Sequence, residues 1–403
     1  MSKLCFTIDR AHADPLQLQI RSYIVNAILQ GQLRTGTRLP STRSLAKQLG
    51  VSRNTVVQAY QELVVQGYLD TNQRSAYCVS AQPLARPESI NLPAQEARIK
   101  WDERFCLHPD TLPNIVKPSD WIQYRYPFIY GQPDPQLFPV NAWRLCSARA
   151  ISRGTLANWT GDNIHNDDPE LIDLVKTQLL LQRGILARDD QILMTLGAQN
   201  ALYMAVQLLC RSGAVLCVEE PGYPDIRNMA ILAGAKVKPV DVKLDDAAWG
   251  DALKDSTLIY VTPGHHLPTT RTMPIARRKH LIEIAARYDC LIIEDDYECE
   301  TDFSEQANPA LKAMDTEGRV IYVGSLSKSL FPGLRIGYVV ADTALIAQMR
   351  ALRRLIARHV PLPIQRTVAQ FIALGYHQAL VRSLRRTYQQ RWRKITTLAD
   401  ILL

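Results

Sequence analysis

The sequence predicts a protein of two parts, a small basic winged helix-turn-helix domain ahead of a larger α/β domain with a mostly parallel sheet. The chain has 403 residues, which is more than one ordinary domain contains. Residues 1–80 carry short helical patterns separated by glycine turns, and nine Lys/Arg against four Asp/Glu. From about residue 170 onward, apolar strand patterns alternate with helical ones, which is typical of an α/β layered fold.

Composition excludes several classes of protein. The N-terminus has no apolar signal segment and no run of eighteen apolar residues occurs, so we expect neither secretion nor a membrane span. The eight cysteines form no CxxC pair and no histidine cluster accompanies them. We therefore expect free buried thiols in a reducing cytoplasm, and no metal site.

Basic residues are concentrated at the two ends of the chain. Residues 343–403 contain eleven Lys/Arg and one acid, so within the net charge of +8 the middle of the chain is acidic. A small basic domain ahead of an acidic body indicates a polyanionic partner at the front. A solvated basic surface would give the same charge, so the charge alone does not distinguish it from a surface that binds a polyanion.

The basic front domain is predicted to hold three short helices. Apolar residues recur at helical spacing between Pro15 and Gly31, which is a typical C-terminal stop. A second helix follows Pro40 and ends at Gly50, and Ser52 caps a third. Two short helices around a tight glycine turn form a helix-turn-helix, and "GYLDTNQRSAYCVS" then predicts a two-stranded wing.

Polar side chains open the third helix, where a recognition helix contacts base edges. These are Ser52, Arg53, Asn54 and Thr55. Arg43 opens the second helix and is expected to reach phosphate, and Arg74 lies at the tip of the wing. A capping role alone is the competing interpretation of the polar run, and the length of the whole pattern disfavours it.

Residues 10–80 resemble the GntR-type winged helix through "LPSTRSLAKQLGVSRNTVVQAYQELVVQGYL". The resemblance implies that the third helix binds a double-stranded DNA operator. The wing departs from the family pattern because "TNQRSAYCVS" has no glycine-rich tip, which bears on its minor-groove contact. Residues 81–118 contain six prolines and no sustained period, so they are predicted to be a linker between domains 1–80 and 119–403.

Ligands of parallel sheets bind beyond the carboxyl ends of the strands, so the residues at those ends are candidates for a site. After the first strand, Gly197, Ala198 and Gln199 open a helix whose N-terminus suits a phosphate, although many helices begin this way. Tyr223 follows the second strand, where an aromatic side chain is more often a packing residue. The fourth strand ends in "IIEDDY", and burying these carboxylates costs free energy unless a cation or a proton donor pairs with them. A metal site or a solvated strand end is the alternative interpretation.

The fifth strand ends in "GSLSKSL", which places Lys328 between Ser325 and Ser327, with Arg335 beyond. A desolvated lysine is a nucleophile for an aldehyde. Pyridoxal 5′-phosphate (PLP) needs such a lysine, a phosphate cradle and a carboxylate for its pyridinium nitrogen, and all three follow predicted strands. A buried lysine paired with a local acid is the alternative interpretation.

Residues from about 125 to 403 resemble the fold-type I aminotransferase domain, in which helices cover both faces of the sheet. Joined to a GntR-type winged helix, this is the architecture of the MocR/GabR family of regulators. The resemblance implies that Lys328 carries the internal aldimine, that Asp295 pairs with the pyridine nitrogen, and that Tyr297 bonds the phenolic oxygen. It further implies cofactor contacts from Tyr223, His265, Gly197, Ala198, Gln199, Ser325, Ser327 and Arg335.

The resemblance implies a cytoplasmic, homodimeric transcription regulator whose aminotransferase-like domain senses an amino acid or amine through an external aldimine. A catalytically active aminotransferase carrying a winged helix, and an inert truncated product, are the alternatives. The family's Pro-Thr-Gly is here Pro268-Thr269-Thr270, and the loss of the glycine is expected to shift the backbone near the cofactor ring. The family continues beyond the position of Leu403 with a small domain carrying a carboxylate-binding arginine, so we expect that domain to be largely missing and a sensor to be favoured over a turnover enzyme.

Overall fold

The computed structural model describes residues 7–72, 76–80, 99–127, 131, 133–243, 246–298 and 308–402. The chain divides into two units, Met1–Arg104 and Phe105–Leu403, and this division falls inside the proline-rich segment 81–118. Among the helices described, none is both long and apolar enough to cross a membrane.

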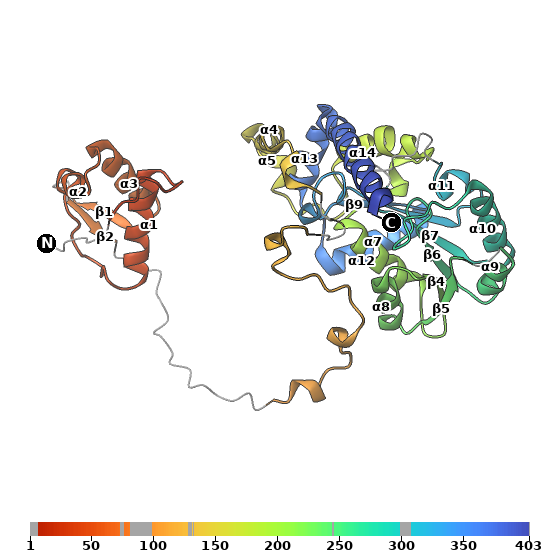
Figure 1. The fold of residues 1–403 in the computed structure, drawn as a ribbon. Coiled ribbons are helices and arrows are strands. Elements are labelled where there is room, and N and C mark those ends of the chain that lie inside the picture. Colours follow the sequence, from red (N-terminus) through yellow and green to blue (C-terminus); the bar gives the residue numbers. More distant parts are fainter. Residues whose placement is uncertain are drawn as a thin grey trace. The chain divides into compact units, whose positions relative to one another are not determined.

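The smaller unit is a helix-turn-helix followed by a hairpin (Figure 1). Its elements are α1 (Leu16–Leu29), α2 (Thr42–Leu49), α3 (Arg53–Val65), β1 (Leu69–Asn72) and β2 (Ala76–Val79). Gly50 adopts φ +66° at the end of α2, a left-handed conformation that allows the sharp turn into α3. Ser41 and Ser52 cap α2 and α3 by accepting bonds from backbone N–H groups, and the sequence predicted the cap by Ser52.

Tyr60 organises the core of the smaller unit. Its ring is fully buried and lies 4.8 Å, centroid to centroid and edge-on, from the ring of Tyr77 on β2. Its hydroxyl donates a 3.0 Å hydrogen bond to the carbonyl of Pro40, just before α2. One residue of α3 therefore ties together the hairpin and the entry to α2, which fixes the angle at which α3 is presented.

The larger unit is built on a seven-stranded sheet with the order β3-β9-β8-β7-β6-β4-β5 (Figure 1). Its strands are β3 (Ile192–Thr195), β4 (Val215–Glu220), β5 (Lys236–Asp241), β6 (Leu258–Val261), β7 (Leu291–Asp296), β8 (Val320–Ser325) and β9 (Gly337–Val340). The pairs among β4, β5, β6, β7 and β8 are parallel, and β9 runs antiparallel to both β3 and β8. The predicted mostly parallel sheet is confirmed.

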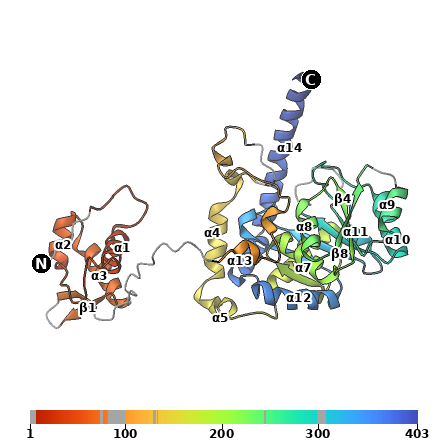
Figure 2. The ribbon, with the colours of Figure 1, turned by 90° about the horizontal axis from the view of Figure 1, so that it is seen from below.

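Helices cover both faces of this sheet (Figures 1 and 2). One face packs on α7 (Gly197–Leu209), α8 (Pro224–Leu232) and α12 (Thr343–Ala357), and the other on α9 (Asp246–Leu253), α10 (Ile275–Arg287) and α11 (Leu311–Met314). Strand β6 shows why, since Leu258 and Tyr260 join the first core whereas Ile259 and Val261 join the second. Alternating side chains that are all apolar require cover on both sides.

A further group of helices packs around the β3 and β9 edge. It comprises α4 (Val140–Ala150), α5 (Leu156–Trp159), α6 (Pro169–Leu174), its π-helical continuation Val175–Leu180, α13 (Leu362–Ala373) and α14 (Tyr376–Leu402). Short 3-10 turns occupy Trp101–Glu103, Pro109–Thr111, Trp121–Gln123, Pro135–Leu137, Arg153–Thr155, Leu181–Arg183, Asp189–Gln191 and Pro332–Leu334. Leu384 of α14 is buried and Tyr388 packs against the same core, so α14 has an apolar stripe that faces the rest of the unit.

One expectation needs correction. Not every thiol is buried: Cys146, Cys210, Cys217 and Cys290 are, but Cys78 is half-buried and Cys106 is exposed, and Cys5 and Cys299 lie outside the described residues. The basic C-terminal segment 343–403 also contributes a buried charge to the core. Arg353 is fully buried, where its guanidinium pairs with Asp167 at 2.6 Å and donates to the carbonyl of Met194. This buried guanidinium therefore connects α12 to β3.

Candidate cofactor site

Lys328 lies in the loop between β8 and β9, beyond the carboxyl end of β8. Its Nζ is 5.5 Å from the centroid of the Tyr297 ring, which follows β7. Burial lowers the pKa of Lys328, and the positive charge of Lys117 acts in the same direction, whereas Glu298 and Asp295 oppose the shift. A lysine with a lowered pKa has a larger neutral, nucleophilic fraction at neutral pH.

Asp295 lies near the end of the neighbouring strand β7 and is 5% exposed. The hydroxyl of Tyr260, on β6, donates a 2.7 Å hydrogen bond to its Oδ2. Its Oδ1 is buried and has no hydrogen-bond partner among the residues that the structure describes. Burial raises the pKa of Asp295 to about 7, against the effect of the Tyr260 hydrogen bond.

Tyr297 and His265 form the side of the site next to Asp295. Their ring centroids are 6.1 Å apart in an edge-on arrangement, and burial raises the pKa of Tyr297. The Nε2 atom of His265 lies 3.6 Å from a carboxylate oxygen of Glu298. The loop after β6 and the end of β7 are thus brought together, as the sequence predicted for neighbouring parallel strands.

A concave, donor-rich surface forms where α7 begins. Gly197 adopts φ +77°, and a Cβ built there would lie only 2.9 Å from Nη2 of Arg335. Arg335 itself has φ +49° and donates a 3.0 Å bond to the carbonyl of Leu196. The absence of a side chain at position 197 therefore lets a guanidinium lie against a helix N-terminus, and both groups attract an anion.

Ser325 and Ser327 lie beside Lys328. The Oγ of Ser325 accepts a 3.2 Å bond from the backbone N–H of Ser327. The Oγ of Ser327 is buried without a hydrogen-bond partner among the described residues. Ala198, the second residue of α7, is half-buried and packs against the core of the adjacent sheet face.

Tyr223 stands at the start of α8 and is tied to the start of α7. Its hydroxyl lies 2.6 Å from Oε1 of Gln199 and 3.0 Å from Oδ2 of Asp225, and Nε2 of Gln199 donates to the same Asp225 oxygen. Gln199 is therefore engaged with side chains of α8. This network holds the Tyr223 ring in place next to the α7 N-terminus.

Sequence reasoning missed a part of the proline-rich segment that packs near this site. Asn228 of α8 donates a 2.8 Å hydrogen bond to the carbonyl of Pro113. A cavity of about 480 Å³ lies between this segment and the starts of α7 and α8, and its walls include Leu112, Gln199 and Arg335. The segment has no apolar period, so only the fold reveals its contact.

Gly131 is a second missed residue. A Cβ built at this position would lie 2.6 Å from Nζ of Lys328, and the residue has φ +73°. The only signal in the sequence is a glycine in the turn-rich stretch "YGQPDP". Tyr260 is a third, because its place inside an apolar strand gave no hint of a polar partner.

The residues present fit PLP on three observations. Asp295 offers a buried acceptor atom with no partner among the described residues, which is what a protonated pyridine nitrogen requires. The hydroxyl of Ser327 is buried and equally without such a partner, and Gly197 and Arg335 form a surface that suits a phosphate. Lys328 supplies a half-buried amine whose pKa is lowered by desolvation.

The candidate DNA-contacting residues that the structure describes lie at the starts of α2 and α3. Arg43, Arg53 and Asn54 are exposed. Ser52 is also exposed, and its Oγ accepts from the N–H of half-buried Thr55 at 3.1 Å, so both residues take part in the cap of α3. Arg74 lies outside the described residues. Arg53 and Asn54 therefore have side chains available at the start of α3.

Comparison with known proteins agrees with both units. Residues 16–79 match the family described as bacterial regulatory proteins, gntR family, and residues 164–400 match aminotransferase class I and II. The chain is 43% identical over 388 residues to the HTH-type transcriptional regulator TauR of Rhodobacter capsulatus, covering 95% of this chain and 79% of that protein. It is 32% identical over 391 residues to the probable rhizopine catabolism regulatory protein MocR of Rhizobium meliloti, covering 95% and 77%.

Among solved structures, kynurenine aminotransferase of Pyrococcus horikoshii is 27% identical, with a TM-score of 0.60 over 65% of this chain and 67% of that one. The fold and the matches define a DNA-binding helix-turn-helix fused to an aminotransferase-like domain of fold type I. The chain belongs to the MocR-type family of HTH transcriptional regulators.

Proposed function

We propose that this regulator binds PLP at Lys328, senses an amino acid or amine there, and changes its affinity for an operator in response. The observation that carries the proposal is the convergence of Lys328, Asp295 and Tyr297 at the carboxyl ends of β7 and β8, with Oδ1 of Asp295 available. PLP supplies an aldehyde that amines attack and a ring that withdraws electrons from them.

Each of the chain's own groups has a defined task in this proposal. Asp295 holds a proton at the pyridine nitrogen through Oδ1, while Tyr260 keeps its other oxygen in place. Tyr297 would donate a hydrogen bond to the phenolic oxygen, and the amine of Lys328 would hold the cofactor. The N-terminus of α7 and the guanidinium of Arg335, which lies against Gly197, would hold the phosphate.

The remaining contacts follow from the positions of the side chains. Tyr223 would stack on the ring, because its bonds to Gln199 on α7 and Asp225 on α8 hold its side chain beside the α7 N-terminus. His265, Ala198, Gln199, Ser325 and Ser327 complete the cofactor's surroundings. Binding of an effector amine changes the charge beside Lys117, which belongs to the proline-rich segment leading to the winged helix.

On the DNA side, Arg53 and Asn54 read base edges, and Arg43 and Arg74 contact phosphates. We further propose a homodimer in the cytoplasm. Several large apolar side chains on and beside α4, among them Val140, Leu145 and Ile151, are exposed, which supports burial against a second copy. A paired arrangement of half-sites in the operator follows.

The cofactor site is tested first. The chain and its Lys328→Ala variant are incubated with PLP, reduced with borohydride and digested. A visible absorption band and a pyridoxyl modification on the peptide containing Lys328 are expected in the wild-type chain alone. Equal labelling of the variant would overturn the assignment of Lys328.

The regulatory role is tested by titrating amino acids and amines into the PLP-loaded protein on its upstream DNA. One ligand is expected to change both the visible band and the DNA affinity, and the affinity should fall steeply with salt. Steady release of keto acid from that ligand would instead identify a working aminotransferase.

A further inference from the structure

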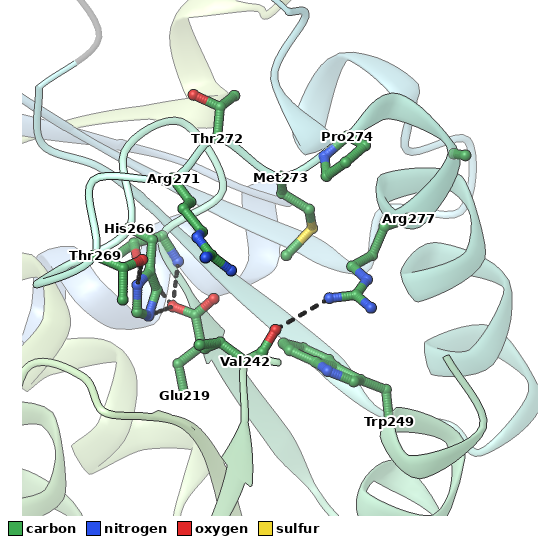
Figure 3. A pocket seen from close by; sticks show the side chains of 12 residues that line it. Glu219, Val242, Trp249, His266, Thr269, Arg271, Thr272, Met273, Pro274 and Arg277 are labelled. Carbon is green, nitrogen blue, oxygen red and sulfur yellow. Dashed lines mark hydrogen bonds and ion pairs between the residues drawn. The ribbon is translucent and has the colours of Figure 1, made fainter. Parts of the chain in front are cut away.

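The larger unit contains a cavity of about 620 Å³ at the carboxyl ends of β4 and β6 (Figure 3). Its walls combine the apolar side chains of Val242, Trp249 and Met273 with the charged groups of Glu219 and Arg271. Its volume is in the range of small-molecule sites. None of its lining residues belongs to the cofactor site described above.

Glu219, the charged group on the cavity floor, is 4% exposed. Its Oε2 accepts 2.9 and 2.8 Å bonds from the N–H and hydroxyl of Thr262, and lies 3.7 Å from Nε2 of His266. Within the described residues its Oε1 has no hydrogen-bond partner. Figure 3 shows this second oxygen directed into the cavity on the side of Arg271.

The electrostatics of Glu219 favour a cationic ligand. Burial raises its pKa to about 7, and the neighbouring charge of Asp295 acts in the same direction, whereas the two bonds from Thr262 oppose the shift. The pKa of the adjacent His266 is lowered by burial, so the imidazole is neutral near pH 7 and supplies no positive charge. A buried carboxylate without a cationic partner protonates instead, and an ammonium group would relieve that cost.

Two arginines complete the cavity wall. Arg277 donates a 3.2 Å bond to the carbonyl of Val242, and its guanidinium lies 5.9 Å from the ring of Trp249, so it is part of the wall itself. Arg271 is exposed, and no ion pair holds its guanidinium within the described part of the chain. The cavity thus presents an acceptor at its floor, a guanidinium at its rim, and the apolar side chains of Met273 and Trp249 to one side of both (Figure 3).

We propose that this cavity is a second ligand site, which binds an intact amino acid with an apolar side chain. The ammonium group contacts Oε1 of Glu219, the carboxylate contacts Arg271, and the side chain packs on Met273 and Trp249. The site holds its ligand without covalent chemistry, and it does not require PLP or Lys328. Because Glu219 and Asp295 interact, its occupation also changes the electrostatics at the cofactor ring.

The test is calorimetric titration of L-phenylalanine into the full chain carrying Lys328→Ala, without PLP. Matched probes are 3-phenylpropanoate, which lacks the ammonium group, and phenethylamine, which lacks the carboxylate. Only L-phenylalanine is expected to bind, and binding near pH 7 should release a proton because the ammonium group selects the charged form of Glu219. Affinity should therefore fall as the pH drops below about 7.

Two variants locate the site. Arg271→Ala is expected to weaken binding about tenfold or more, whereas Arg287→Ala, an equal loss of charge on exposed α10 surface, should leave it unchanged. Glu219→Gln keeps an acceptor for Thr262 and should abolish proton release.

Absence of L-phenylalanine binding to the Lys328→Ala chain would overturn the proposal, and so would binding of 3-phenylpropanoate with equal affinity. Neither result bears on the cofactor, since no PLP is present in the experiment.

Discussion

The hydroxyl of Tyr260 lies 2.7 Å from Oδ2 of Asp295 and joins strand β6 to the candidate cofactor carboxylate on β7. Tyr260→Phe removes this donor and leaves a buried oxygen without a partner, so the free energy of unfolding should fall by about 1–3 kcal/mol. The loss should be larger at pH 8.5 than at pH 5.5, because the bond lowers the pKa of Asp295 by favouring its charged form. Urea denaturation at the two pH values measures it.

The matched control for this change is Tyr322→Phe. Tyr322 is another buried tyrosine, whose hydroxyl lies 2.8 Å from Asp296, one residue further along β7. The Tyr322→Phe variant should be less stable than the wild type but should keep the pH midpoint of the cofactor's visible band, whereas Tyr260→Phe should shift that midpoint. Identical spectra for wild type and Tyr260→Phe would show that Tyr260 supports only the fold.

Gly131→Ala is expected to prevent covalent attachment of PLP. The added methyl group would lie 2.6 Å from Nζ of Lys328 and displace the amine. Gly318→Ala is the control, because Gly318 has a similar φ of +78° but no heavy atom within 4 Å of a built Cβ. Both variants acquire backbone strain, so loss of borohydride-fixed cofactor in Gly131→Ala alone isolates the contact with Lys328.

Thr270 adopts φ +58°, a left-handed conformation that a β-branched residue rarely takes. This is the position at which the Pro-Thr-Gly pattern has glycine. Thr270→Gly should therefore raise the free energy of unfolding by about 1 kcal/mol, as the strain removed exceeds the extra chain entropy. Thermal melts measure the change. Thr272→Gly is the control, because Thr272 has no positive φ, and this substitution should leave the free energy of unfolding unchanged or lower it.

The cofactor-free protein should lose stability as the pH rises from about 5 to 8. Burial raises the pKa values of Glu219 and Asp295 to about 7, above their ordinary values, so the folded protein holds protons that the unfolded chain releases. That stabilisation is complete below the unfolded pKa and is lost as the pH passes the folded pKa. Asp295→Asn should flatten the dependence, and an unchanged slope in this variant would contradict the assignment.

Arg53→Ala should weaken operator binding by about 1–3 kcal/mol and leave the cofactor spectrum intact, because the side chain is exposed at the first position of α3. Fluorescence anisotropy with labelled upstream DNA at two salt concentrations measures the loss. Arg287→Ala, which removes the same charge from α10, is the control. Equal affinity of Arg53→Ala and wild type for the operator would argue against α3 as the recognition helix.

Most of the sheet and of the candidate site could be predicted because both follow a local rule. Asp295 lies near the end of the apolar strand β7, Tyr297 directly follows it and Lys328 lies shortly beyond β8, and the carboxyl ends of parallel strands meet at one edge. Two strands were not predicted. β5 carries Lys236, Lys238 and Pro239 at the sheet edge, and β9 is a four-residue run that turns back without a helix.

The unpredicted parts of the site depend on contacts between distant segments. Gly131 meets Lys328, and Pro113 meets Asn228, across long stretches of chain. No periodicity signals such contacts, because each is a single side chain against a backbone. Tyr260 is a different case, because its ring fits the apolar pattern of the strand and nothing in that pattern indicates the hydrogen bond of its hydroxyl to Asp295.

The close approach of Gly197 and Arg335 has a consequence for how this family can evolve. A side chain at position 197 would occupy the place of the guanidinium, so Gly197 cannot be replaced without a shift of Arg335. Substitution at position 197 should therefore accompany or follow the loss of the arginine. Lineages that abandon a phosphorylated cofactor should be recognisable by the simultaneous loss of this glycine and this arginine, even where the rest of the sheet is retained.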